Sequence, residues 1–188
     1  MDQIRLRLSI FLLVSVAFSV NTLAQDTRGW IGNGLGASLA GGGVGLSDRA
    51  SVQLVFGNVG VSARASVNDG GASEYRGFFG RLRDEAFDAG ATVGYAMQRP
   101  GGGYWIVGAG PSVVWGRRII GAEEPPCFIR CAAEWEDYGP TAGVAIDAGM
   151  YAPFSKVFGY SIVLHANLNK EQSFVGLTFG VTVGKQRR

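Results

Sequence analysis

The stretch YWIVGAGPSVVWGRR, Tyr104–Arg118, would have two faces of different character if it formed a strand. Every second residue from Trp105 to Trp115 is apolar, and this row has a tryptophan at each end. The residues between them include Gly108, Gly110 and Ser112, which are small. Alternation with a period of two residues is typical of a β-strand. The stretch therefore predicts a strand with one bulky apolar face and one face of small residues.

The spacing of the two tryptophans matches the thickness of a membrane. Ten residues of strand span roughly 33 Å, and a tilt of about 40° reduces this to a height of about 25 Å. This is the height of the apolar band of a transmembrane β-barrel, and aromatic rings are favoured at its two edges. We therefore predict that Trp105 and Trp115 belong to an aromatic girdle.

The same alternation recurs along the chain and predicts eight strands. Most short turns alternate with longer loops, among them 40–48, 68–86 and 118–137. This rhythm is typical of an up-and-down barrel inserted from one side of a membrane. The predicted strands are 30–39, 49–57, 59–67, 87–98, 103–117, 138–151, 157–168 and 173–184.

Few charged residues lie within the predicted strands. In the last strand, Val175, Leu177 and Phe179 alternate with Gly176 and Thr178. A water-soluble barrel would fill its interior with bulky side chains and carry charged residues outside. The opposite pattern predicts lipid around the barrel and small or polar residues inside it. We therefore expect an all-β fold, an eight-stranded antiparallel up-and-down transmembrane β-barrel.

The N-terminus has the features of an export signal. Arg5 and Arg7 precede an apolar run of 13 residues, 8–20, and small residues follow up to Ala24. This predicts a signal peptide over 1–24 and a barrel domain over 25–188, and the run is too short for a spanning helix. The formal net charge of +2 gives no electrostatic reason to expect nucleic-acid binding.

Cys127 and Cys131 are the two cysteines of the chain. An exported protein reaches an oxidising compartment, where a disulfide between them is the default expectation. Free thiols are the alternative. Metal binding would need further ligands close by, and we expect no metal or cofactor.

A small set of polar residues falls on the inward rows of the predicted strands. Buried charges must be paired, and positions counted from the inner turns suggest Arg64 with Asp147 and Asp88 near His165. We expect a structural network that plugs the lumen, with gating or proton-linked conduction as the alternative. The predicted lumen residues are Gln53, Arg64, Asp88, Asp147 and His165.

The closing segment GYSIVLHANLNKEQSFVGLTFGVTVGKQRR, residues 159–188, shows the pattern most clearly. With it, nearly the whole predicted mature chain resembles the small eight-stranded outer-membrane β-barrels, the OmpA-like and OmpX-like superfamily and uncharacterised porin-family barrels of Gram-negative bacteria. The resemblance implies a location in the outer membrane. Such barrels usually end in an aromatic residue, whereas this chain ends in Arg187-Arg188.

These features favour an integral outer-membrane barrel of structural or surface-binding type that is not an enzyme. The alternatives are a narrow or gated channel, a secreted lipocalin-like carrier and, less favoured, an enzyme that modifies lipid A. The expected partners are outer-membrane lipid, lipopolysaccharide and the barrel-assembly machinery, with no nucleic acid. We expect a monomer.

Overall fold

The computed structural model describes residues 27–40, 43–70, 76–77, 80–81, 84–122 and 133–185. The predicted signal peptide and both cysteines lie outside these residues, so their predictions remain open. None of the described residues forms a helix long and apolar enough to cross a membrane. The strands are β1 (Arg28–Ala40), β2 (Gly43–Phe56), β3 (Val59–Gly70), β4 (Arg76–Gly77), β5 (Gly80–Arg81), β6 (Asp84–Gln98), β7 (Tyr104–Ala122), β8 (Ala133–Pro153), β9 (Phe158–Asn169) and β10 (Phe174–Lys185).

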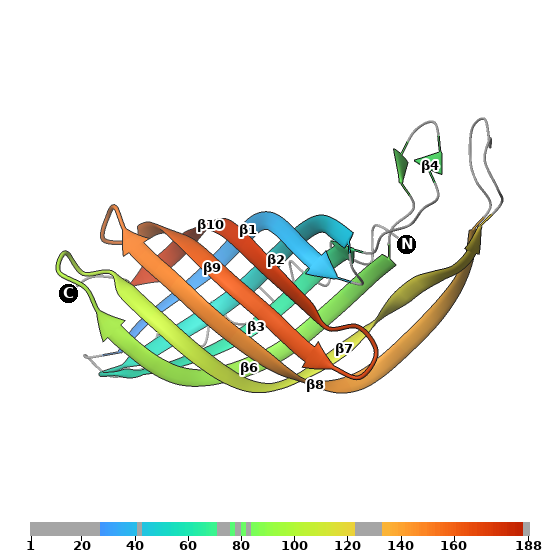
Figure 1. The fold of residues 1–188 in the computed structure, drawn as a ribbon. Coiled ribbons are helices and arrows are strands. Elements are labelled where there is room, and N and C mark those ends of the chain that lie inside the picture. The colour runs from blue at the N-terminus through green and yellow to red at the C-terminus, as the bar shows by residue number, and fades with distance from the viewer. Residues whose placement is uncertain are drawn as a thin grey trace.

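Eight of these strands form a closed barrel (Figure 1). Each barrel strand is antiparallel to the next one along the chain, and β1 closes the ring by pairing with β10. The short strands β4 and β5 form a separate two-stranded sheet between β3 and β6. The predicted all-β, eight-stranded, up-and-down fold is therefore confirmed.

The register of the strands sets the tilt of the barrel. A path through hydrogen-bonded partners leaves β1 at Gly29, crosses every strand once and returns to β1 at Leu39, ten residues further along. A shear of this size in eight strands corresponds to a tilt of about 40° from the barrel axis. A strand segment of ten residues therefore spans the height expected from the sequence.

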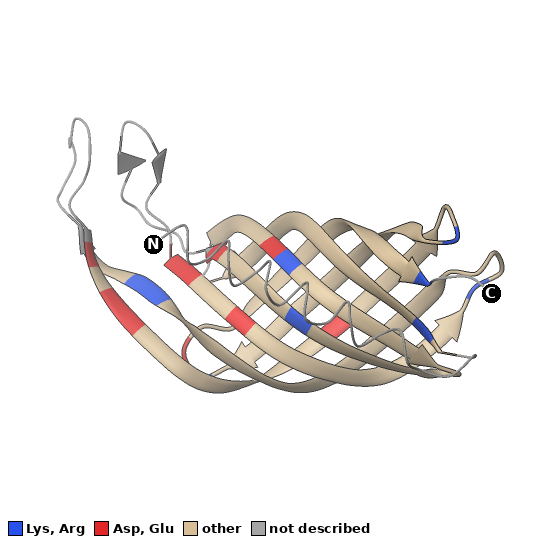
Figure 2. Ribbon diagram, turned by 180° about the vertical axis from the view of Figure 1, so that it is seen from behind, with Lys and Arg blue, Asp and Glu red and all other residues tan. Residues whose placement is uncertain are grey.

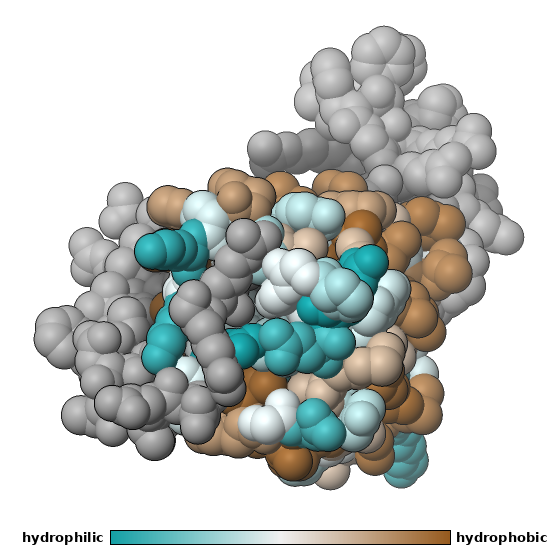
Figure 3. Space-filling view, turned by 90° about the vertical axis from the view of Figure 1, so that its left-hand side faces the viewer, coloured by the Kyte–Doolittle hydropathy of each residue, from teal (hydrophilic) through white to brown (hydrophobic). Residues whose placement is uncertain are grey.

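The two faces of each strand point as the sequence predicts. Val107 is 58% exposed and Leu177 is 41% exposed on the outer wall, whereas Thr178 is buried in the lumen at 2%. Figure 3, an end-on view, shows hydrophilic residues on the end face and hydrophobic residues around the flank. The apolar residues therefore cover the outside of the barrel.

Two connections differ from the prediction. The loop predicted over 40–48 is largely strand, because β2 already begins at Gly43. Within this segment Val44 and Leu46 point outward, whereas Ser47 is buried. Gly43 and Gly45 of this segment lie on the inward row of β2, in line with Ser47. The second difference is that both β7 and β8 extend into the predicted loop 118–137. Strand β7 ends at Ala122, and β8 begins at Ala133. Figure 1 shows this pair rising beyond the other strands at the outer end, which is the end of the longer connections.

Candidate functional site in the barrel lumen

Four charged side chains form a chain of ion pairs inside the barrel. Asp147 receives Nη1 of Arg64 at 2.5 Å on Oδ1 and Nη2 of Arg49 at 3.0 Å on Oδ2. The second guanidinium nitrogen of Arg64, Nη2, lies 3.0 Å from Oδ2 of Asp88. All four residues are at most 5% exposed. The predicted partners Arg64 and Asp147 are therefore in contact, and Asp147 has a second cation.

The strands bring these residues together because each occupies an inward row. Arg49 lies on β2, Arg64 on β3, Asp88 on β6 and Asp147 on β8. The two ion pairs of Asp147 therefore cross the lumen, whereas Arg64 and Asp88 lie on neighbouring strands. Arg64 also donates from Nη2 to the carbonyl oxygen of Ala166 on β9 at 2.8 Å. The network therefore ties together walls of the barrel that are not neighbours in the sheet.

Toward the outer end, uncharged polar side chains continue the network. Asn167 donates to Oδ1 of Asp88 at 2.5 Å and to the hydroxyl of Ser112 at 2.8 Å. Asn68 donates to the hydroxyl of Ser66 at 2.9 Å and accepts a hydrogen bond from Ser47 at 2.7 Å. These residues fill the lumen above the ion pairs with groups that have partners.

His165 occupies a fully buried position beside this network. Its Nε2 lies 3.1 Å from the hydroxyl of Ser47, and its ring meets Phe174 edge to face with centroids 6.0 Å apart. Asp88, which the sequence predicts near His165, bonds Arg64 and Asn167, and Asn167 is the next inward residue after His165 on β9.

Two lumen glycines make room for these large side chains. A Cβ atom at Gly176 would lie 2.2 Å from Nε2 of His165. A Cβ atom at Gly143 would lie 2.5 Å from Oδ1 of Asn167. The small row that the sequence shows is therefore the complement of the few large polar residues inside.

At the inner end, aromatic residues close the lumen. Trp30 stacks on Tyr104 with ring centroids 5.9 Å apart and lies 5.1 Å from the ring of Tyr151. Arg28 donates a hydrogen bond to the hydroxyl of Tyr104. The predicted lumen residue Gln53 is buried here and donates to the carbonyl oxygen of Val61 at 3.2 Å.

Several lumen residues were absent from the sequence prediction. Arg49, Ser47 and Asn68 all belong to the network, and each continues a predicted inward row at a strand end. Arg49 is four residues before Gln53 on β2 and so has the same parity. The alternation therefore contained the signal for Arg49, whereas Ser47 and Asn68 fell in segments read as loops.

Among the described residues, the buried polar groups form no evident metal site, and a few of them lack a hydrogen-bond partner. No group of three or more His, Cys, Asp or Glu residues that could hold a metal ion occurs among the described residues. Within the same part of the chain, the buried Nε atoms of Arg49 and Arg64, Nδ1 of His165 and Nε1 of Trp30 have no hydrogen-bond partner. The arrangement can hold charge firmly, because each of the four charged side chains in the ion-pair chain has at least one oppositely charged partner.

Beyond the barrel rim, charged residues on the extended strands also pair. Arg117 makes a two-pronged contact with Glu85, at 2.7 Å from Nη2 and 3.1 Å from Nε, and lies over the ring of Trp135 at 4.6 Å. Nε of Arg118 donates to Glu136 at 2.6 Å. Hydrogen bonding to these carboxylates raises the pKa of both arginines. Figure 2 shows such charged positions gathered on the outer part of the long strands, whereas most of the barrel ribbon is uncharged.

The two tryptophans of the predicted girdle both lie on the outer wall. Trp105 is 44% exposed and has the guanidinium of Arg99 5.5 Å from its ring centroid. Trp115 is 42% exposed and stacks on Phe87 with centroids 6.1 Å apart. Their ten-residue separation along β7 places them at opposite ends of the outward apolar row.

Structural comparison identifies the fold, although no family model and no curated protein sequence matches the chain. Neisserial surface protein A superposes with a TM-score of 0.56 at 12% identity, covering 85% of this chain and 97% of that one. Ail, the attachment invasion locus protein of Yersinia pestis, gives 0.55 at 10% identity over 85% and 99%. The N-terminal barrel domain of Pseudomonas aeruginosa OprF gives 0.50 at 14% identity over 86% and 99%. The chain therefore has the fold of the small eight-stranded outer-membrane β-barrels.

Proposed function

We propose that this protein is an integral outer-membrane β-barrel with a closed lumen, whose biological contacts are made at its outer end. The observation that carries the proposal is the inverted distribution of polarity. Leu35, Val107 and Phe179 are each 58% exposed or more on the outer wall, whereas charged residues occupy the lumen. Water around such a wall would be unfavourable, and lipid is the solvent that suits it.

The closed lumen argues against free diffusion of solutes. Arg64 and Asp147 meet across the barrel, and the Trp30 cluster fills the inner end. Eight strands leave a lumen just wide enough for side chains, so these residues occupy the space that a channel would need. A gated channel would have to break ion pairs between residues that are at most 5% exposed.

A lipocalin-like carrier and an enzyme are less well supported. A carrier holds its ligand in an apolar lumen, whereas this lumen contains Arg49, Arg64 and Asp147. The contact between Ser47 and His165 has the residue types of a catalytic pair, but Nδ1 of His165 meets no acid and both side chains are buried.

The outer end supports contact with the cell surroundings. The β7–β8 extension carries Trp135, Arg117 and Arg118 above the barrel. Arginines can bind lipopolysaccharide phosphates, but Glu85 and Glu136 already compensate these two charges. We therefore place outer-membrane lipid around the wall, lipopolysaccharide at the rim as a weaker contact, and the assembly machinery as the route of insertion. Ail has also been solved with the heparin analogue sucrose octasulfate, a precedent for ligand binding by this fold.

The test combines insertion and conductance. We expect the protein expressed in a Gram-negative host to fractionate with the outer membrane and resist extraction by urea. Its folded form should migrate differently from the heated form on a denaturing gel. In planar bilayers the reconstituted protein should show no steady conductance. Release by urea would contradict the membrane assignment, and stable open channels would contradict the closed lumen.

A further inference from the structure

The outer wall of the barrel carries a polar pair among apolar residues. Asn33 on β1 donates from Nδ2 to Oδ1 of Asp48 on β2 at 3.2 Å, and both side chains are exposed. Their neighbours along the outward rows are Leu35 at 65% exposure and Leu46 at 65% exposure. This pair plays no part in the lumen network, so the proposed function does not explain it.

The barrel geometry places this pair within the apolar band. Trp115 is linked to Asp48 through hydrogen-bonded partners on β6 and β3, namely Phe87 and Val67. Each step between tilted strands changes the height by about 3 Å, so Asp48 lies roughly 9 Å below Trp115. Asn33 lies deeper still, because its partner Ala50 is two residues closer to the inner end of β2. Both residues therefore lie where lipid tails would surround a lone barrel.

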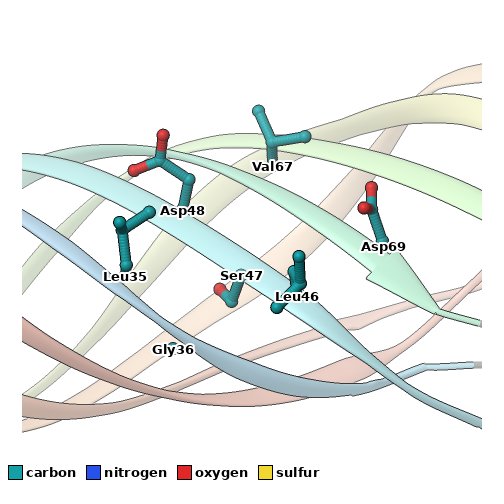
Figure 4. Close-up of a pocket in the computed structure, with 7 residues that line it drawn as sticks. All are labelled: Leu35, Gly36, Leu46, Ser47, Asp48, Val67 and Asp69. Atoms are coloured by element: carbon teal, nitrogen blue, oxygen red, sulfur yellow. The ribbon is translucent and has the colours of Figure 1, made fainter.

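The wall around the pair combines small residues with a hollow. Small outward residues surround it, including Ala37, Ala50, Ala63 and Ala65. Beside it a hollow of about 300 Å³ opens in the wall (Figure 4). The residues lining the hollow are Leu35, Gly36, Leu46, Ser47, Asp48, Val67 and Asp69. Small residues let another protein surface approach closely within a membrane.

The aromatic residues of the outer wall avoid this region. Phe56, at the inner end of β2, is the one large exposed aromatic residue among the described positions of β1–β3. Strands β6–β10 carry many more at exposed outward positions. These include Tyr95, Trp105, Trp115, Phe158, Tyr160 and Phe179. Since aromatic rings anchor a barrel wall to the lipid interface, their scarcity distinguishes β1–β3 from the other strands of the wall.

The pair is complementary to itself. A carboxylate within the apolar band is unfavourable unless donors surround it. The bond from Asn33 uses one of its two amide N–H groups and one of the two oxygens of Asp48. Copies inserted in the same direction are related by a two-fold axis along the membrane normal, which keeps equal residues at equal depth. A second copy would therefore bring its own amide and carboxylate to the depth of the first pair.

We propose that the outward face of β1–β3 is the interface of a homodimer, in which Asn33 of each copy donates to Asp48 of the other. This inference rests on the proposed membrane location and replaces the expectation of a monomer. The hollow beside Leu35 receives apolar side chains from the second copy, and the small residues let the two walls approach.

Cysteine crosslinking in liposomes tests the interface. In a chain with Cys127→Ser and Cys131→Ser, Ala50→Cys lies beside the polar pair and Ala166→Cys lies on β9, on a different strand of the wall. Both alanines are partly exposed and point outward. Oxidation at low protein-to-lipid ratio should yield a dimer band for Ala50→Cys and little for Ala166→Cys. Adding Asp48→Leu should lower the association constant at least about tenfold, because hydrogen bonds to a charged group are lost.

Heat-dependent gel mobility distinguishes a failure to form the dimer from a failure to insert into the membrane. Inserted, heat-modifiable protein with equal crosslinking at both positions, or with no effect of Asp48→Leu, would overturn the dimer and leave the membrane barrel standing. Failure of the cysteine-containing parent chain to insert would overturn both. If the cysteine-free chain alone fails to fold, energy transfer between amine-labelled parent copies, with and without Asp48→Leu, gives the same readout.

Discussion

The lumen and the outer wall of this barrel are built from alternate residues of the same strands, yet opposite rules govern them. On β2, Arg49 is 4% exposed and ion-paired, whereas Leu46 three residues earlier is 65% exposed. Inside, a charge is tolerated because its partner is fixed across the lumen. Outside, an apolar residue is tolerated because lipid replaces water. The comparison shows that exposure alone does not predict the cost of a substitution here.

Of the substitutions considered, removal of the carboxylate of Asp147 in the lumen should have the largest effect on stability. Asp147→Ala leaves Arg49 and Arg64 with one carboxylate between them, and the bound guanidinium groups lose most of their compensation. We expect a loss of roughly 3–5 kcal/mol in unfolding free energy, because an unpaired buried charge is costly. Urea titration of the protein in liposomes measures the loss. Arg49→Gln combined with Asp147→Asn serves as the control and should recover part of it, and equal stability of the wild type and Asp147→Ala would contradict the role of the network.

The second prediction tests the outer wall with a matched pair of substitutions. Ile146 is 36% exposed on β8, near mid-height by its pairing with Ala109, and Ile120 is 55% exposed on β7 beyond Trp115. Ile146→Lys should cost roughly 2–4 kcal/mol, because it places a charge near the bilayer midplane. Ile120→Lys should change the stability little. The same urea titration measures both, and equal small effects would mean that water covers the wall.

Substitution of Trp115, at the edge of the apolar band of the outer wall, should have the smallest effect on stability. Trp115→Ala removes the stacking contact with Phe87 and an interfacial ring. We expect a loss of about 1 kcal/mol, in the range of a single aromatic pair. Quenching of tryptophan fluorescence by lipids brominated at different depths, in a chain that keeps only Trp115, locates the ring. A ring quenched best from the centre of the bilayer would contradict its place in the girdle.

Much of this structure could be predicted from the sequence, because alternation along a strand shows which residues share a face. The rows of Trp105 and Val175 gave the fold, the number of strands and the direction of the side chains. The contact of Arg64 with Asp147 followed from the rule that buried charges pair. The partners of His165 did not follow, since they depend on how far each strand is shifted against the next. Arg49 was within reach of the same alternation, because the predicted strand 49–57 contains it, whereas the predicted loop 40–48 hid Ser47 near the start of β2.

The pair of β1 and β10 stands apart from every other ladder in the barrel. The other barrel neighbours follow each other along the chain, whereas the partners Gly29 and Lys185 are separated in sequence by all the other barrel strands. We expect contacts so distant in sequence to form late, because closing the chain between them has the largest entropic cost. Until that seam closes, both edges expose unpaired backbone groups that hydrocarbon cannot satisfy. We therefore expect entry into the bilayer and completion of the ring to occur as one cooperative event.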